Sequence, residues 1–316
     1  MRNDRVNRRQ LGAWLFAGLT APIAQFGGGM TWQMVALVAA ICLTSCWFLS
    51  RTGVELGKWL CAVQYVWLIL VLASVGRWIT GSWSGGNVYP AVPLVLLALA
   101  AVSTHRGSGN AARAGSVVFW LIALIYSAVM AAGAGKVEPT ELIGFDRKLD
   151  LRLVVILLVP TLTACLPGNE RKVPVSALTG IGVFAVLLSI LITGALSVPV
   201  ALREDAPLFE WVEGLSLAGT LQRFEALVSV ALTMGWFALV SFLLCVAGQL
   251  ADSIKRGSNR RGIWIAASAG SLTMLTRLSE ATSVIGIGSA VMWVVVPGIM
   301  AIGGAGKKLK ISKNNA

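Results

Sequence analysis

Long apolar stretches separated by short polar gaps constrain the fold of this 316-residue chain more than any other feature. Most of them reach about 20 residues, the length that an α-helix needs to cross the roughly 30 Å hydrocarbon core of a bilayer. Inside that core the backbone has no water to bond to, so a spanning segment pairs its own polar groups as a helix. A mean hydropathy of +0.78 and a charged share of 13% agree with a chain solvated by lipid. The sequence therefore predicts an all-α integral membrane protein.

About ten transmembrane helices are expected from these stretches. The stretch 262–277 is the shortest of them. The first stretch follows basic residues, as in a signal peptide, but it contains Pro22 and no small-residue cleavage motif follows it. We therefore expect it to stay as a helix of the mature protein. The expected ranges are 11–29, 32–50, 57–80, 89–105, 114–134, 150–167, 174–199, 223–250, 262–277 and 283–304.

Basic residues lie almost entirely in every second gap between these stretches. The same gaps contain few acids, namely Asp4, Glu55, Glu170 and Asp252. Because cytoplasmic loops carry the excess of lysine and arginine, the pattern places both termini in the cytoplasm and makes the number of spans even. The net charge of +12 then follows from membrane topology and needs no nucleic-acid partner. The basic residues of these gaps are Arg2, Arg5, Arg8, Arg9, Arg51, Lys58, Arg106, Arg113, Arg171, Lys172, Lys255, Arg256, Arg260, Arg261, Lys307, Lys308, Lys310 and Lys313.

The polar segment 136–149 divides the expected spans into two equal sets. An odd number of spans in the first set makes the second set enter the membrane from the opposite side, which is the inverted-repeat arrangement of many secondary transporters. We therefore expect a single transmembrane domain, 1–316. Its repeats are 1–135 and 150–304, and a basic cytoplasmic tail, 305–316, follows them.

The other long gap, 203–222, places apolar residues beside acids. This mixture predicts an amphipathic segment that lies against the outer face of the membrane. The apolar residues are Leu208, Phe209, Trp211, Val212 and Leu215.

Each expected repeat opens with a helix that contains a proline near mid-bilayer, Pro22 in the first span and Pro160 in the sixth. A proline removes one backbone donor and displaces the carbonyl four residues before it, which frees polar backbone at a depth where lipid cannot satisfy it. We expect both helices to be broken there and the breaks to face a ligand pocket. The alternative is two kinked helices whose threonines bond to their own carbonyls. The candidate ligand-binding residues at these breaks are Thr20, Pro22, Gln25, Gly27, Pro160, Thr161 and Thr163.

Polar residues within other spans extend the candidate pocket, because buried polar groups in a membrane usually face the interior of the bundle. Glu225, Ser229 and Thr233 recur every four residues and form one polar stripe on the eighth span. Gln64 and Tyr65 lie near mid-depth in the third span. We include all of these as candidate ligand-binding residues. Each hydroxyl could instead bond to the carbonyl one turn back, and Glu225 could instead pair with a neighbouring arginine or with the helix dipole.

Reactive groups are sparse in this chain. Cys42 and Cys46 lie one turn apart in an apolar helix, the other three of the five cysteines are solitary, and His105 is the one histidine. We therefore expect neither a metal cluster nor a disulfide framework. The sequence also lacks a phosphate-binding loop, an intramembrane aspartyl pair and a nucleophile–base constellation. No enzymatic activity, catalytic residue or cofactor is expected.

Residues 206–251, APLFEWVEGLSLAGTLQRFEALVSVALTMGWFALVSFLLCVAGQLA, resemble the spore germination permeases, the GerAB-type B subunits of nutrient germinant receptors. In that family an aromatic and acidic loop leads into the start of a helix, and the specific similarity is confined to 208–227. Supporting similarities are 7–11 before the first span, 57–60 at the start of the third, and 166–167 before a basic turn. The resemblance covers most of the chain in order. The family is related to the amino acid–polyamine–organocation transporters.

The resemblance implies a LeuT-like transporter fold with broken first and sixth helices and a central pocket for a small nutrient, such as an amino acid, a sugar or a nucleoside. It also implies A- and C-type partner subunits in the inner membrane of a bacterial spore. Such a subunit would sense its ligand and pass the change on as a population shift. Two alternatives stay open, namely a secondary amino-acid transporter of the same fold and a scaffold subunit with a degenerate pocket.

Overall fold

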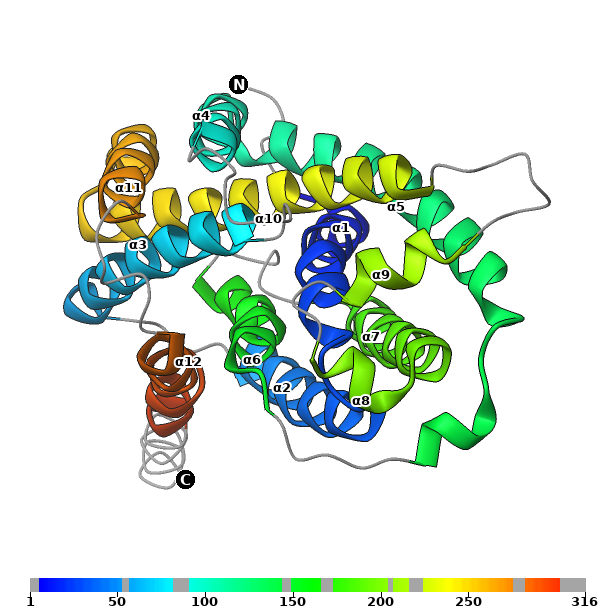
Figure 1. Ribbon diagram of the computed structural model, residues 1–316. Coiled ribbons are helices and arrows are strands. Elements are labelled where there is room, and N and C mark those ends of the chain that lie inside the picture. The colour runs from blue at the N-terminus through cyan, green and yellow to red at the C-terminus, as the bar shows by residue number, and fades with distance from the viewer. Residues whose placement is uncertain are drawn as a thin grey trace.

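The computed structural model describes residues 6–52, 57–81, 91–143, 149–165, 173–203, 207–215, 224–274 and 282–301. Within these ranges all regular secondary structure is helical (Figure 1), which confirms the expected fold class at the level of an all-helical bundle. The first half contains α1 (Arg8–Gly27), α2 (Trp32–Thr52), α3 (Lys58–Gly81), α4 (Ala91–His105), α5 (Ser108–Ala134) and a 3-10 helix, η1 (Pro139–Ile143). The second half contains α6 (Leu151–Leu158), the 3-10 helix η2 (Val159–Cys165), α7 (Val175–Leu196), α8 (Val198–Ala201), α9 (Pro207–Glu213), α10 (Phe224–Ile254), α11 (Asn259–Met274), α12 (Thr282–Ala290) and a π-helix, η5 (Val291–Val295).

Six of the described helices are long and apolar enough to cross a membrane. Two shorter apolar helices, Ala91–His105 and Leu151–Thr163, occur in the same bundle. The protein is therefore an integral multi-pass membrane protein, as expected. Each of the ranges expected to span contains a helix, whereas the total number of spans stays a prediction. The long apolar helices are Trp32–Arg51, Lys58–Thr80, Ser108–Ala134, Val175–Leu196, Glu225–Ile254 and Thr282–Ala301.

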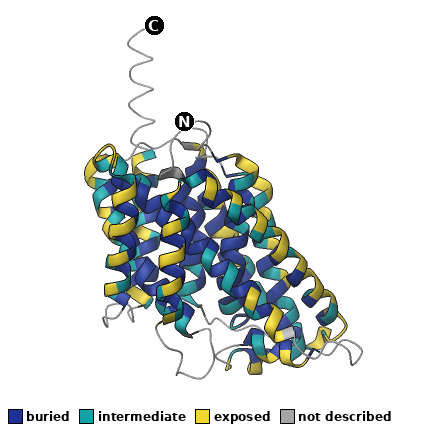
Figure 2. Ribbon diagram, turned by 90° about the horizontal axis from the view of Figure 1, so that it is seen from above, coloured by how far each residue is buried: buried dark blue, intermediate teal, exposed yellow. Residues whose placement is uncertain are grey.

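The helices divide into an inner and an outer set. In the most apolar stretch of α10, 78% of the residues are buried, whereas in that of α5 only 28% are buried. Most residues of α1 are buried as well, and α1 lies among α5, α6, α7 and α10 (Figure 1). Exposed residues run along the outside of the bundle in Figure 2. The inner helices α1 and α10 are therefore shielded from lipid by the others.

The backbones of α1 and α10 approach closely because glycine lies at their crossing. A Cβ atom on Gly18 of α1 would lie 2.9 Å from the backbone nitrogen of Leu239. On α10, a Cβ atom on Gly235 would lie 2.6 Å from the Cβ atom of Ala21. Small residues allow this contact, and close packing is the main source of helix association in a membrane. Sequence positions far apart are thereby joined at the centre of the bundle.

One face of the bundle gathers the starts of α3 and α11 with the end of α4. The Tyr65 hydroxyl of α3 donates to the Gly262 carbonyl of α11 at 2.6 Å. The Trp264 indole of α11 donates to His105 Nδ1 of α4 at 3.2 Å. Because only two residues separate the end of α4 from the start of α5, that start belongs to this face too. The basic residues expected to be cytoplasmic here are Lys58, Arg106, Arg113, Lys255, Arg256, Arg260 and Arg261.

The opposite face is closed by η1 and α9. The Trp32 indole at the start of α2 donates to the Leu142 carbonyl of η1 at 3.1 Å. The α9 residue Trp211 is 2% exposed, and a Cβ atom on Gly133 of α5 would overlap its ring. Lys136 donates to the carbonyl of Gly214, directly after α9. The segment expected to lie amphipathically on the membrane therefore packs instead against the protein, because α5 offers a glycine that accommodates the indole.

Candidate functional site

The first expected break is wrong, because α1 continues as an α-helix through Pro22 to Gly27. The Thr20 hydroxyl donates to the Ala17 carbonyl at 2.8 Å, so its bond lies within its own helix. A proline is tolerated inside a membrane helix when neighbouring helices support it. The close contact of α1 with α10 at Gly18 supplies that support.

At Pro160 the chain changes its type of helix rather than unwinding. The α-helix α6 ends at Leu158, and η2 continues from Val159 as a 3-10 helix. The Thr161 hydroxyl donates to the Leu158 carbonyl at 2.6 Å, and the Thr163 hydroxyl donates to the Pro160 carbonyl at 2.7 Å. The threonines of both proline-containing helices therefore bond to their own carbonyls, as in the alternative derived from the sequence.

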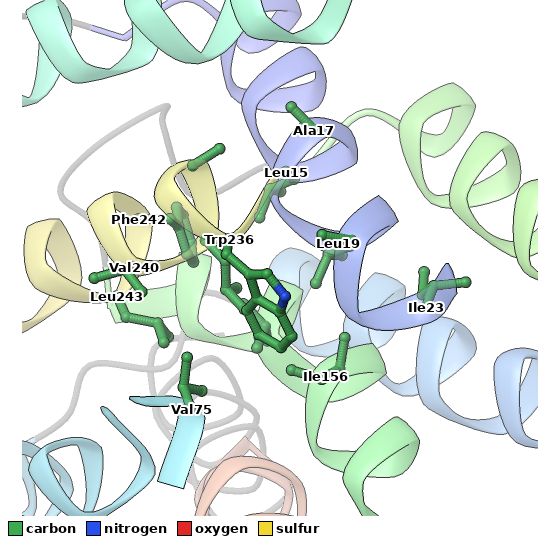
Figure 3. Packing of buried hydrophobic residues seen from close by; sticks show 14 of the residues in the cluster. Leu15, Ala17, Leu19, Ile23, Val75, Ile156, Trp236, Val240, Phe242 and Leu243 are labelled. Carbon is green, nitrogen blue, oxygen red and sulfur yellow. The ribbon is translucent and has the colours of Figure 1, made fainter. Parts of the chain in front are cut away.

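The indole of Trp236 lies where α1, α3, α6 and α10 meet. Figure 3 shows it extending from α10 into the space beside Leu19 and Ile23 of α1, with Val75 of α3 and Ile156 of α6 nearby. The residue is fully buried, and its indole nitrogen has no hydrogen-bond partner among the described residues. A buried donor left unpaired costs about 1–3 kcal/mol. This nitrogen is therefore available to an acceptor that enters from outside the chain.

An aromatic cluster extends from Trp236 toward the C-terminal end of α1. The Phe26 ring centroid lies 5.7 Å from that of Trp78 on α3 and 6.3 Å from that of Trp236, in edge-to-face arrangements. The guanidinium carbon of Arg152, at the start of α6, lies 4.4 Å from the Phe26 ring centroid. Ring edges and a cation thus meet at one phenylalanine, as expected for attraction to an aromatic face.

Gln25 adds an acceptor to the same end of α1. Its amide nitrogen donates to the Trp78 carbonyl at 3.3 Å. Its amide oxygen is buried and has no partner among the described residues. An amide oxygen accepts up to two hydrogen bonds, so a donor from a ligand would find it free. The expected site residue Gly27 is buried two positions further along the helix.

An ion pair lies at the edge of this cluster. Asp150 caps α6 by accepting from the Arg152 backbone at 2.8 Å, and its carboxylate also accepts from the Arg152 guanidinium at 2.6 Å. The Arg152 side chain is 43% exposed and that of Asp150 16%. A pair this exposed adds little stability, but it holds two opposite charges in fixed positions. We call Gln25, Phe26, Trp78, Arg152 and Trp236, with Asp150, the α1–α6 site.

The α1–α6 site combines aromatic walls with one unpaired acceptor, one unpaired donor and a charge of each sign. Such a set suits a small ligand that is partly apolar and carries both a donor and an acceptor. Among the described residues, no group of histidine, cysteine and acidic side chains could hold a metal ion. The groups gathered here can contact a ligand through ring faces, hydrogen bonds and charge.

Gln64 and Tyr65 lie apart from this site. The Gln64 amide donates to the Met292 carbonyl in the π-helix η5 at 3.3 Å, and Tyr65 bonds to Gly262 as described above. A π-helix displaces its carbonyls from the regular ladder, which presents one of them to a side chain. These two residues therefore join α3 to the helices beside it.

The polar stripe of α10 also lies outside the α1–α6 site. Glu225 is exposed, and Ser229 and Thr233 are half-buried. The Thr233 hydroxyl donates to the Ser229 carbonyl at 2.8 Å. Of the residues proposed from the sequence, the structure brings Gln25 into the α1–α6 site. Glu225, Ser229 and Thr233 lie outside it, on the first turns of α10.

Sequence reasoning missed Phe26, Trp78, Arg152 and Trp236. The aromatic residues occur in apolar stretches and are indistinguishable there from ordinary core residues. Arg152 follows an acid at a helix start, where a loop charge is common. A useful signal would have been Trp236 directly after Gly235, since a large ring beside a glycine accompanies a close helix crossing.

No protein-family model matches the sequence, and no curated protein is significantly similar to it. The fold is similar to that of Mhp1, a nucleobase-cation-symport-1 family transporter solved in a closed conformation with bromovinylhydantoin bound. The TM-score is 0.57 at 15% sequence identity, and the match covers 94% of this chain and 77% of that one. The chain therefore has a transporter-like membrane fold, and Mhp1 is a transporter rather than an enzyme.

Proposed function

We propose that this protein binds a small nutrient in the α1–α6 site and acts as a ligand-sensing membrane subunit. The observation that carries the proposal is that two of the seven buried polar atoms without partners among the described residues, the oxygen of Gln25 and the indole nitrogen of Trp236, belong to residues of the α1–α6 site. Polar groups buried without partners are costly, and a bound ligand that pairs with them would remove that cost. The fold adds support, because it is similar to that of a transporter solved with a small ligand bound.

An amino acid is the ligand class that fits these groups best. The Arg152 guanidinium can receive a carboxylate, while Asp150 and the Gln25 oxygen can accept from an ammonium group. The rings of Phe26, Trp78 and Trp236 supply an apolar surface for a side chain. Thr20, Pro22, Thr161 and Thr163 lie on the same two proline-containing helices and stay candidate ligand-binding residues.

The assignment to a spore germination receptor rests on the resemblance of residues 208–227 to the germination permeases. On this proposal the subunit lies in the inner membrane of a bacterial spore, with both termini in the cytoplasm, and binds A- and C-type subunits. Ligand binding then shifts the population of two conformations of the receptor.

A secondary transporter is the second candidate, and the similarity to Mhp1 favours it. Its mechanism would be the alternation of two inverted repeats around the same site. The two candidates differ in flux, since a sensor binds its ligand without concentrating it.

The proposal is tested with purified protein in lipid nanodiscs and radiolabelled amino acids. We expect saturable binding that Gln25→Leu lowers at least tenfold. Gln33→Leu is the matched control, because Gln33 on α2 donates to the Leu142 carbonyl, away from the site. Binding that both variants retain equally contradicts the site. Concentrative uptake into proteoliposomes that contain this protein alone contradicts the sensor and supports the transporter. The absence of binding by every amino acid tested contradicts the amino-acid ligand class.

A further inference from the structure

A lateral groove opens between the N-terminal parts of α1 and α7 and the first half of α5. It has a volume of about 600 Å³. Its floor is apolar, with Phe16 of α1 in edge-to-face contact with Phe119 of α5 at 5.3 Å. Small residues such as Ala13 and Gly180 leave the space above these rings open, and Trp120 forms a rim that is 73% exposed. The groove lies on the outside of the bundle, where lipid chains are the neighbours.

Positive charge lies at one end of this groove. Arg8 and Arg9, at the first turn of α1, line it and are exposed. Arg113 is exposed one turn before Ser116, which lines the groove on α5, so it lies on the same helical face. None of the described residues that line the groove is acidic. A long apolar channel with guanidinium groups at its end complements a molecule with an anionic head and an apolar tail.

A second groove on the bundle is apolar but lacks basic residues in its described lining. It lies between α2 and α7, with a volume of about 630 Å³, and its described lining contains no charged residue. Trp47 forms part of that lining, with the Arg51 guanidinium stacked on the ring at 4.8 Å. Both grooves can hold an acyl chain, but the α1–α5–α7 groove alone has free arginines lining it within the described residues.

We infer that the groove between α1, α5 and α7 binds one anionic phospholipid of the inner leaflet. The phosphate lies between the guanidinium groups of Arg8 and Arg9, and one acyl chain lies along Phe16, Phe119 and Trp120. Arginine forms paired hydrogen bonds with phosphate, and an anionic headgroup near a bilayer surface gains from each basic residue. The lipid would hold α1, whose other end carries the α1–α6 site, against α5 and α7.

The test is native mass spectrometry of the detergent-purified protein with dioleoyl phosphatidylglycerol and, separately, dioleoyl phosphatidylcholine. We expect one tightly retained phosphatidylglycerol and weaker retention of phosphatidylcholine. Replacing both groove arginines, R8Q with R9Q, should lower phosphatidylglycerol affinity about fivefold for each arginine. The charge-matched control, R260Q with R261Q, changes two exposed arginines of α11 that do not line the groove and should leave affinity within about twofold.

Two further variants separate the groove from surface charge and from misfolding. A Cβ atom on Gly180 would lie 3.6 Å from the Phe16 ring, so Gly180→Leu places a side chain in the groove while Arg8 and Arg9 stay intact. We expect G180L to lower retention of phosphatidylglycerol. The charge-preserving pair R8K with R9K should retain this lipid, in contrast to R8Q with R9Q. Equal retention of the two lipids by the wild-type protein, equal losses in the groove and control pairs, or full retention by G180L would each overturn the inference.

Discussion

Arg152 of α6 lies over the ring of Phe26 of α1, with 4.4 Å between the guanidinium carbon and the ring centroid. This contact joins the start of one proline-containing helix to the end of the other. The same phenylalanine touches Trp78 and Trp236 through its ring edges. The charge of Arg152 is therefore fixed beside the aromatic surface on which the proposed ligand would lie.

Replacing Arg152 by methionine should lower amino-acid affinity at least about tenfold, which corresponds to ~1.4 kcal/mol. Methionine retains apolar contact with Phe26 but removes the charge that would receive a carboxylate. Equilibrium binding of a radiolabelled amino acid measures the change. Arg203→Met is the control, because Arg203 is exposed in a loop after α8. Equal losses in the two variants would assign the effect to overall charge.

Two buried tryptophans should respond to different extents to the same change. Trp14 donates its indole N–H to the Ala238 carbonyl at 3.0 Å, whereas the indole N–H of Trp236 has no partner among the described residues. Trp14→Phe should therefore lower stability by about 1 kcal/mol beyond the cost of the smaller ring, because it removes a buried hydrogen bond.

Trp236→Phe should lower the stability of the ligand-free protein less than Trp14→Phe does, since both changes shrink a buried ring but Trp236→Phe removes an unpaired donor. It should reduce the thermal stabilisation that a bound amino acid gives. Thermal unfolding in detergent, with and without ligand, measures both effects. A destabilisation by Trp236→Phe as large as that by Trp14→Phe would show that this N–H is satisfied in the ligand-free protein.

A methyl group added at the α1–α10 crossing should destabilise the protein. Gly18→Ala would place a Cβ atom 2.9 Å from the Leu239 backbone nitrogen, and backbone cannot move aside as a flexible side chain can. We expect a loss of about 1–3 kcal/mol in unfolding free energy. Gly298→Ala is the matched control, because no atom lies within 4 Å of its added Cβ. Comparable stability of the two variants in thermal unfolding would argue against the close crossing.

Pro22→Ala should raise thermal stability, because α1 is already α-helical on both sides of the proline. Alanine restores the backbone donor and is favoured over proline in a helix interior by about 3 kcal/mol, an upper value for a supported membrane helix. Thermal unfolding in detergent measures the change. A lower unfolding temperature would mean that the proline ring makes contacts that outweigh the restored hydrogen bond.

The membrane character and the helical ranges could be predicted from the sequence because they depend on local composition. A stretch such as 174–199 is apolar over the length of a bilayer, and α7 (Val175–Leu196) occupies it. The alternation of basic gaps agrees with the gathering of Lys58, Arg106 and Arg260 around one face. These properties need no knowledge of which helices touch.

The site could not be predicted to the same extent, because it depends on contacts between distant segments. Gln25 was found from its place beside Pro22, although that proline does not break α1. Trp78 and Trp236 lie far apart along the chain, and both of their rings contact that of Phe26. The threonines near both prolines were misleading, because a threonine hydroxyl in a membrane helix can donate to a backbone carbonyl one turn earlier in the same helix.

The interlocked backbones at Gly18 and Gly235 have a mechanical consequence. Sliding or rotation of one helix against the other would lose this close packing, so we expect α1 and α10 to move together. Any opening that admits a ligand must therefore separate this pair from α3 or α6. Such a motion would carry Phe26 and Trp236 together away from Trp78 or Arg152, so the aromatic cluster would separate between α1 and one of these two helices.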